Sequence, residues 1–315
     1  MVAIIIGLIS SMFFSATFVV TKAMGVGGTN WAWTACLRFV LAIPFLFLIV
    51  LMRGNLNGLF KSIKQKFWRW MLWGNLAGVG FYFMLSFASL FAPSWLTSGT
   101  WQITILAGIL LSPLFFTVIE TKNGPKKVRG KIELKRLLLA SVILVGVILM
   151  QINEASSISI KSLILGFVPV VIAAFIYPLG NRKLMEMCKG EVDSFQRSFG
   201  VALVSMPICI VLGIYGFTKT GIPTYGQFGE AIILALCSGV IATITFFYAT
   251  DKAKHSLSLL AAVESTQSGI IVFTILGSVL FLHGKFPTGL SLVGVIVVIL
   301  GMISNSLIKD KKGKI

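Results

Sequence analysis

The chain has 315 residues, of which 57% are hydrophobic and only 12% are charged, and its formal net charge is +17. Soluble domains carry about 25% charged residues, so this chain lacks the polar groups needed to cover a surface in water. The composition excludes the soluble globular, disordered and disulfide-scaffold classes. We therefore expect an integral membrane protein.

Ten apolar segments follow one another along the chain, with no long polar stretch between them. A bilayer core about 30 Å thick is crossed by about 20 helical residues, and each segment has roughly that length. The segments lack the alternation of barrel strands, and unpaired backbone groups are costly in lipid, so each is predicted to be a helix. An all-α membrane protein without a soluble domain follows. The predicted spans are 2–22, 31–52, 69–91, 94–117, 135–152, 162–180, 195–217, 230–250, 258–282 and 288–308.

Basic residues are distributed unevenly between the spans, and this predicts the orientation. Of the 27 Lys and Arg residues, 21 fall on the side of both termini and four on the opposite side, while two lie inside spans. Lys and Arg accumulate on the cytoplasmic side of membrane proteins. Both termini are therefore expected in the cytoplasm. The chain is expected to lie in the plasma membrane, where its main partner is the lipid bilayer. The positive charge needs no nucleic-acid partner.

An internal repeat relates the two halves of the chain. Gly7 precedes Arg38 by 31 residues, and Gly166 precedes Arg197 by the same interval. Because each half has five helices, an odd number, the halves enter the membrane from opposite sides. Such a fold offers two similar arrangements, each open to one face, which indicates transport by alternating access. The predicted five-helix repeats are 1–152 and 153–315, the second with a short basic cytoplasmic tail.

Two segments of the second half have the character of a known family. Residues 281–303 read FLHGKFPTGLSLVGVIVVILGMI, and residues 263–273 read VESTQSGIIVF. With the ten spans and the Gly-to-Arg spacing, the first segment resembles the drug/metabolite transporter superfamily, EamA-like branch. The second is similar to multidrug resistance efflux transporters within it. The resemblance covers essentially the whole chain and implies two inverted five-helix halves that move small organic molecules. It also implies an acidic residue after the fourth and ninth helices, where this chain has Glu120 and His283.

A few ionisable side chains fall inside the predicted spans, and each is a candidate functional residue because burying a charge there costs about 2.5–3.5 kcal/mol. Glu264 is the only carboxylate well inside a span, about 9 Å deep at 1.5 Å per residue. Arg197 lies near the same face and Arg38 about 20 Å from it, so depth favours a pair between Glu264 and Arg197. Two roles stay open for Glu264: exchanging the coupling proton, or acting as a structural anion.

The arginines and two glutamines leave further alternatives open. Arg38 is expected either to bind an anionic group of the substrate or to donate to carbonyls at helix ends. Arg197 either extends to the membrane interface or contributes to the site. Polar residues of a lipid-embedded helix point to a neighbouring helix or to a wet cavity. Gln102 and Gln267, at matching places of the repeat, are expected to face a shared cavity.

Aromatic residues and prolines complete the candidates. Trp101, Tyr82 and Tyr177 are candidates for contact with an apolar or cationic substrate, although packing explains each of them as well. Prolines kink helices, and Tyr177-Pro178 in the sixth span is the expected hinge. The predicted substrate and coupling residues are Glu264, Arg38, Gln102, Gln267, Trp101, Tyr82, Tyr177 and Arg197.

Missing motifs narrow the function. The chain contains neither GxxxxGK[ST] nor HExxH, which argues against an ATP-driven pump and a metalloprotease. Its four cysteines are scattered, so neither a disulfide, a metal site nor a cofactor is predicted, and no enzymatic activity is expected. We predict a secondary transporter, monomeric or homodimeric, that exports small organic molecules or drugs with proton coupling. Uptake or exchange of an amino acid or other metabolite, and lipid scrambling or sensing, are the alternatives.

Overall fold

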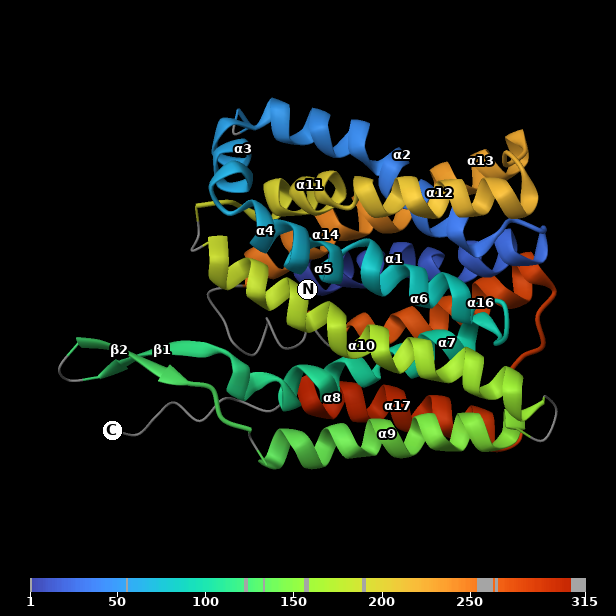
Figure 1. Ribbon diagram of the computed structural model, residues 1–315. Coiled ribbons are helices and arrows are strands. Elements are labelled where there is room, and N and C mark those ends of the chain that lie inside the picture. Colours follow the sequence, from blue (N-terminus) through green and yellow to red (C-terminus); the bar gives the residue numbers. More distant parts are fainter. Residues whose placement is uncertain are drawn as a thin grey trace.

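The computed structural model is a bundle of helices (Figure 1) that buries hydroxyl groups beside its apolar core and exposes many large apolar side chains. Helix α1 (Val2–Val26) buries Ser10, Ser11 and Ser15, whereas it exposes Ile5 and Met12. Hydroxyls inside and large apolar side chains outside are what a helix surrounded by lipid requires. The structure describes residues 2–54, 56–121, 124–132, 134–155, 159–188, 191–253, 263 and 266–306.

Helices of membrane-spanning length coincide with several of the predicted spans. Within the described residues, five helical segments are long and apolar enough to cross a bilayer, and the bent pair α11–α12 would be a sixth. Shorter apolar helices fall in the fifth, ninth and tenth predicted spans. These lengths and compositions are those of an integral membrane protein. The five segments are Val2–Val26, Trp31–Met52, Phe67–Ala88, Ile160–Cys188 and Tyr225–Phe246.

Several helices run without a break. Besides α1, they are α2 (Trp31–Met52), α9 (Leu134–Ala155), α10 (Ile160–Cys188) and α17 (Gly289–Ser306). Helix α10 continues through Pro169 and Pro178. The hinge expected at Tyr177-Pro178 is therefore not a break in this structure.

The remaining long helices are interrupted, and the interruptions occur at matching places of the two halves. The third and eighth predicted spans each contain a π-helical segment. In the fourth span the helix is interrupted at Gln102, and in the ninth a short 3-10 helix that contains Gln267 precedes the α-helix. The third consists of α4 (Phe67–Arg69), η1 (Trp70–Gly74), α5 (Asn75–Ala77) and α6 (Val79–Ala88), and the eighth of α13 (Tyr225–Leu234), η3 (Ala235–Ile241) and α14 (Ala242–Ala253). The fourth contains α7 (Ser94–Trp101) and α8 (Ile103–Leu110), and the ninth contains η4 (Thr266–Ser268) and α16 (Gly269–Leu282).

Two interruptions face each other and share hydrogen bonds. Helices α11 (Ser194–Val204) and α12 (Met206–Thr220) bend by 45° at Ser205. The Ser205 hydroxyl accepts from the Val79 amide (3.4 Å), which the break at Gly78 leaves without a helical partner. The Asn75 side-chain amide donates to the Val204 carbonyl (3.1 Å). Gly78 permits this approach, because a Cβ there would lie 2.7 Å from the Ser205 hydroxyl.

One end of the bundle carries two elements outside the long helices. Helix α3 (Leu56–Gln65) lies there, with Leu59 buried against the bundle, and so does a hairpin that departs from the expected all-helical chain (Figure 1). The hairpin follows the short helix η2 (Ser112–Leu114) and pairs β1 (Phe116–Thr121) with β2 (Gly124–Arg129) in antiparallel fashion. The β-branched run from Thr117 to Ile119 favours an extended strand. The predicted fourth span, 94–117, is therefore not one helix.

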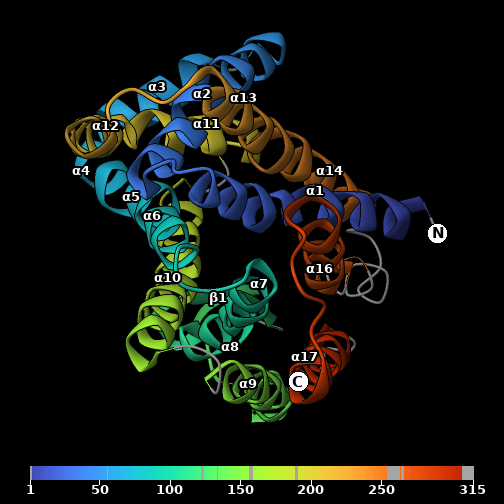
Figure 2. The ribbon, with the colours of Figure 1, turned by 90° about the vertical axis from the view of Figure 1, so that its right-hand side faces the viewer.

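Helices of the two halves pack on each other in reciprocal pairs. Helix α1 packs against α14 and α16, and α10 packs against α6, α7 and α8. Helix α2 packs against α11 and α12, and α9 lies along α17 (Figure 2). Glycines bring the last pair into backbone contact: a Cβ on Gly146 would lie 2.8 Å from the Gly294 carbonyl oxygen, and a Cβ on Gly294 would lie 2.6 Å from that of Gly146. Small residues allow such close approach in membranes.

Candidate functional site

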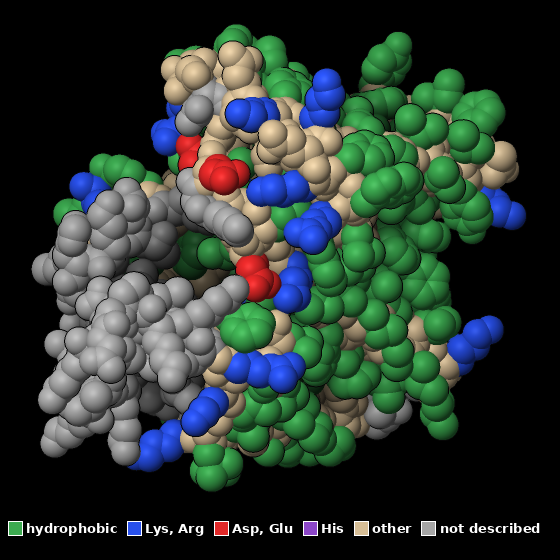
Figure 3. Space-filling view, turned by 60° about the vertical axis from the view of Figure 1, so that its left-hand side comes forward, with side chains coloured by type: hydrophobic (Ala, Val, Ile, Leu, Met, Phe, Trp, Pro, Cys, Tyr) green, Lys and Arg blue, Asp and Glu red, His purple; other side chains and the backbone are tan. Residues whose placement is uncertain are grey.

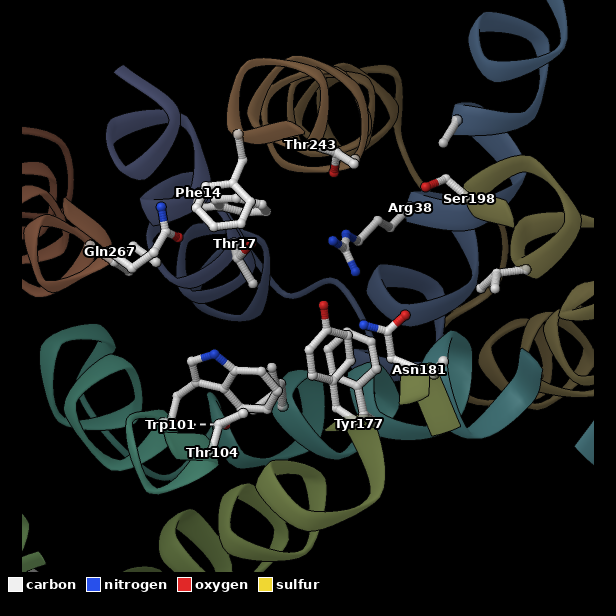
Figure 4. Close-up of a pocket in the computed structure, with 18 of the residues that line it drawn as sticks. Phe14, Thr17, Arg38, Trp101, Thr104, Tyr177, Asn181, Ser198, Thr243 and Gln267 are labelled. Carbon is white, nitrogen blue, oxygen red and sulfur yellow. Dashed lines mark hydrogen bonds between the residues drawn. The ribbon is translucent and has the colours of Figure 1, made fainter. Parts of the chain in front are cut away.

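A cavity of about 580 Å³ lies where the interrupted helices meet. Figure 4 shows side chains from several helices pointing into it. Its wall takes residues from α1, α2, α5, α6, α7, α8, α10, α11, η3, α14 and α16, with Gln267 of η4 and Met302 of α17. Small side chains such as Ala77 and Gly239 leave the space open. The volume is within the range of about 300–1,000 Å³ that small-molecule sites occupy.

Arg38 forms the positively charged part of the wall. It projects from α2, and its Nε donates to the Ser238 hydroxyl (3.2 Å). That hydroxyl donates in turn to the Leu234 carbonyl (3.0 Å), next to the π-helical segment η3. The guanidinium carbon lies 4.1 Å from the centre of the Tyr82 ring, a cation–π contact. Figure 4 shows the guanidinium facing Tyr177 and Asn181 across the cavity.

Tyr82 lies behind Arg38 and does not reach the cavity wall. It is fully buried, and its hydroxyl shares a 2.7 Å hydrogen bond with that of Thr21. The ring of Tyr82 therefore supports the guanidinium, and its hydroxyl joins α6 to α1. In this structure Tyr82 contacts Arg38, and its predicted contact with a substrate stays a prediction.

Three aromatic rings form the apolar part of the wall. Phe81 of α6 lies 5.6 Å from Trp101 and 4.7 Å from Tyr177, measured between ring centres. Trp101 and Tyr177 are 5.5 Å apart. Phe14 of α1 packs edge-on against Phe246 of α14 at 6.4 Å in another part of the wall. These rings offer an apolar surface to a bound molecule.

The two glutamines at the helix interruptions both line the cavity. The Gln102 side-chain amide donates to the Ser98 carbonyl (3.0 Å). The side-chain nitrogen of Gln267 is buried and has no hydrogen-bond partner among the described residues. A buried donor without a partner is costly.

The described wall carries positive but no negative charge. It contains Arg38 and Arg197, the latter in the first turn of α11, whereas no Asp or Glu of the described chain is part of it. Glu264 lies outside the described residues, so its predicted pairing with Arg197 stays a prediction. Figure 3 shows further Lys and Arg side chains gathered on the face that carries α3, while hydrophobic side chains cover the adjoining sides.

The cavity thus brings together six of the eight residues predicted from the sequence. They are Arg38, Gln102, Gln267, Trp101, Tyr177 and Arg197. Sequence reasoning missed other polar lining residues, among them Thr17 and Asn181. Helical spacing was the available signal: Thr17 follows Phe14 by three residues and Asn181 follows Tyr177 by four, so each pair shares one helix face.

Contacts join several helices at the end opposite to α3. The Lys22 ammonium donates to the Ser89 carbonyl (2.7 Å), and the Trp33 indole donates to the Gly221 carbonyl (2.9 Å). Trp31 lies 5.7 Å from Phe87 and 5.6 Å from Tyr215, measured between ring centres. These contacts join α1, α2, α6 and α12 across that end.

Comparison with solved structures identifies the same fold elsewhere. A crystal structure described only as that of a protein aligns with a TM-score of 0.64 and 15% identity, covering 96% of each chain. At this identity the likeness concerns the fold alone.

Comparison of sequences identifies the family. The EmrE family, described as "Putative multidrug resistance efflux transporter", matches residues 1–311. The uncharacterized protein YjlA of Bacillus subtilis (strain 168) is 44% identical over 303 residues, 96% of this chain and 94% of its own. The "Uncharacterized 42.1 kDa protein in intracellular alkaline protease 3'region" of Shouchella clausii is 42% identical over 269 residues, 85% of this chain and 70% of its own. The resemblance found in the sequence is confirmed: the chain belongs to the EmrE-like multidrug resistance efflux transporter family and is a membrane transporter of the drug/metabolite type.

Proposed function

We propose that the chain is a secondary active transporter with ten spans in two inverted five-helix halves, and that it moves small organic molecules across the plasma membrane by alternating access. The central cavity is the substrate site. Two halves of opposite orientation can tip about such a cavity so that it opens to one face and then to the other.

The proposal rests on the reciprocal packing of the two halves. Helix α1 packs against the eighth and ninth predicted spans, and α10 packs against the third and fourth, as a twofold relation requires. The remaining pairs, α2 with α11–α12 and α9 with α17, join equivalent helices directly. Arg38 and Arg197 both line the cavity, as do Gln102 and Gln267. The equivalent glycines Gly7 and Gly166 also lie at helix contacts, against Thr266 and Ala92.

Charge supports an orientation with α3 and the hairpin in the cytoplasm. The basic residues concentrate at that end, as they do on the cytoplasmic side of membrane proteins. The cavity wall includes Leu46 and Arg197, which lie in the cytoplasmic halves of their predicted spans, and Asn181, which directly follows the cytoplasmic end of the sixth span. Because Trp33 and Lys22 join helices at the opposite end, we assign this structure to an inward-facing state.

Family membership supports export as the direction and drugs or other small organic molecules as the cargo. We assign the proton gradient as the energy source and Glu264 as the group that carries the proton. In the sequence Glu264 precedes Gln267, which lines the cavity, by three residues, about one helical turn. Uptake or exchange of an anionic metabolite is the second candidate, because Arg38 projects into the cavity.

Thiol labelling in membrane vesicles tests orientation and alternating access together. The four native cysteines are replaced by serine, and single cysteines are introduced by Lys61→Cys on α3, Ile222→Cys at the opposite end, and Asn181→Cys in the cavity. A membrane-impermeant maleimide is applied to right-side-out and inside-out vesicles. Lys61→Cys should react only from the cytoplasmic side and Ile222→Cys only from outside, since both positions are exposed. Asn181→Cys should react fast from the cytoplasm and slowly from outside.

Two results would contradict the proposal. Reaction of Lys61→Cys and Ile222→Cys from the same side would exclude the assigned orientation. Reaction of Asn181→Cys from one face only, with and without a proton gradient, would exclude alternating access. Movement of a lipid analogue in proteoliposomes without an ion gradient would instead indicate scrambling.

A further inference from the structure

We propose that the cavity selects organic anions with an aromatic or apolar body, and that Arg38 binds the anionic group while Phe81, Trp101 and Tyr177 hold the body. This inference rests on the proposed function, since it names the substrate class of the same cavity. It differs from the binding of organic cations, which the two arginines of the described wall would repel.

Arg38 has donors to spare. A guanidinium carries five N–H donors and accepts none, and the hydrogen bond that Arg38 makes within the described chain uses Nε alone, toward Ser238. One face of its plane is covered by Tyr82 at 4.1 Å. Among the described residues Nη1 and Nη2 have no hydrogen-bond partner, and they match the two oxygens of a carboxylate in a bidentate pair.

Other cations of the bundle act differently. Arg182 donates to the Gly108 carbonyl (2.7 Å) at the end of α8, and Lys183 donates to the Leu114 carbonyl (3.2 Å) in η2. Lys66 likewise donates to the Met187 carbonyl (2.9 Å). These side chains cap helix ends, the role that was the alternative for Arg38. Arg38 instead bonds a serine hydroxyl on η3 and projects into the cavity.

The polar and apolar parts of the wall are placed to hold one molecule between them. Figure 4 shows the Tyr177 hydroxyl and the Asn181 side chain facing the guanidinium, with Trp101 farther from it on the same side of the cavity. An anionic group at Arg38 could thus accept from Asn181 as well, while its aromatic body packs on Trp101. An ammonium group in the same place would meet Arg38 and Arg197 without a described carboxylate.

Binding of matched probes to the purified full-length protein tests the inference. 2-Naphthylacetate, 2-naphthaleneethanol and 2-naphthylethylamine share one aromatic body and differ in charge. Affinity is measured from the ligand-dependent rise in unfolding temperature and from tryptophan fluorescence. The anion is expected to bind at least about tenfold more tightly than the cation, with the alcohol between them. Charge-assisted hydrogen bonds contribute enough for Arg38→Gln to weaken anion binding by about 10- to 100-fold and to leave the alcohol within about twofold.

Further variants control for folding and for neighbouring charges. Arg38→Lys keeps the positive charge but loses the bidentate geometry of the guanidinium, so it should weaken binding of the carboxylate probe several-fold. This variant replaces Arg38→Gln if Arg38→Gln does not fold. Arg182→Gln should leave anion affinity unchanged, because Arg182 caps a helix end. Glu264→Gln should leave the anion preference intact or strengthen it; loss of anion binding in that variant would overturn the proposal.

The remaining outcomes also decide the question. Tighter binding of the amine than of the acid, absence of acid binding at millimolar concentration, or unchanged acid affinity in Arg38→Gln and Arg38→Lys would each overturn the inference. Such a failure together with two-sided labelling of Asn181→Cys would remove the substrate class and leave the transporter. Anion binding together with one-sided labelling of Asn181→Cys would keep the substrate class and exclude alternating access.

Discussion

The contact between α9 and α17 can be tested by adding one methyl group. In Gly146→Ala, the new Cβ would lie 2.8 Å from the Gly294 carbonyl oxygen and 2.9 Å from the Val298 amide nitrogen. Ordinary contact begins at about 3.4 Å, so the two helices must separate by about 0.6 Å. These two atoms belong to the backbone and cannot rotate away; Cγ2 of Val298, also 2.8 Å away, belongs to a side chain. Overpacking of this kind costs about 1–3 kcal/mol.

Gly229→Ala is the matched control, because a Cβ on Gly229 of α13 would meet nothing within 4 Å. Both substitutions replace a helical glycine by alanine, which favours the helix by about 1 kcal/mol. The difference between the variants therefore isolates the contact. At about 2–4 °C per kcal/mol, Gly146→Ala should unfold about 2–12 °C below Gly229→Ala.

The assay is thermal unfolding of the purified protein in detergent, followed by the fraction that stays monodisperse after heating. Gly294→Ala should behave like Gly146→Ala, since its Cβ would lie 2.6 Å from the Gly146 carbonyl oxygen. Equal unfolding temperatures for Gly146→Ala and Gly229→Ala, or a lower one for Gly229→Ala, would refute the close packing of α9 on α17.

Two further predictions concern transport. Glu264→Gln should abolish proton-driven flux in proteoliposomes while the protein stays folded. Unchanged flux would exclude Glu264 as the proton carrier and indicate a structural role. Trp33→Phe removes the donor to the Gly221 carbonyl, a hydrogen bond worth about 1 kcal/mol, and should raise labelling of Asn181→Cys from outside about fivefold. Trp68→Phe, at an exposed position, should leave that rate unchanged, and an equal rise in both variants would exclude Trp33 as part of the outer closure.

Helix placement was largely predictable from the sequence, because apolar length decides what can cross a bilayer. Helix α2 spans Trp31–Met52, the predicted range, and α1 extends four residues beyond its predicted end. The bend at Ser205 had a signal in the sequence, because Pro207 follows it by two residues. The break at Gly78 was not predictable, because its compensation comes from far along the chain: the Ser205 hydroxyl accepts from the Val79 amide, and the Asn75 side chain donates to the Val204 carbonyl.

Most of the site was also predictable as a set of residues. A buried arginine or glutamine in a lipid-embedded helix must face the bundle interior, so Arg38, Gln102 and Gln267 were recognisable by type and position alone. Thr17 had only the weaker signal of its spacing from Phe14, because threonine hydroxyls commonly bond within or between helices.

Roles within the site depended on the tertiary structure. Arg38 contacts Ser238, 200 residues away, and Tyr82, on another helix. Helical periodicity assigns a side chain to a face, but it contains no information on which helix covers that face. The sequence by itself determined that this chain lies in a membrane and which polar groups it hides there. Only the packing of helices from opposite halves decided that Arg38 presents its guanidinium to the cavity while Tyr82 supports it, because those distances depend on the whole bundle.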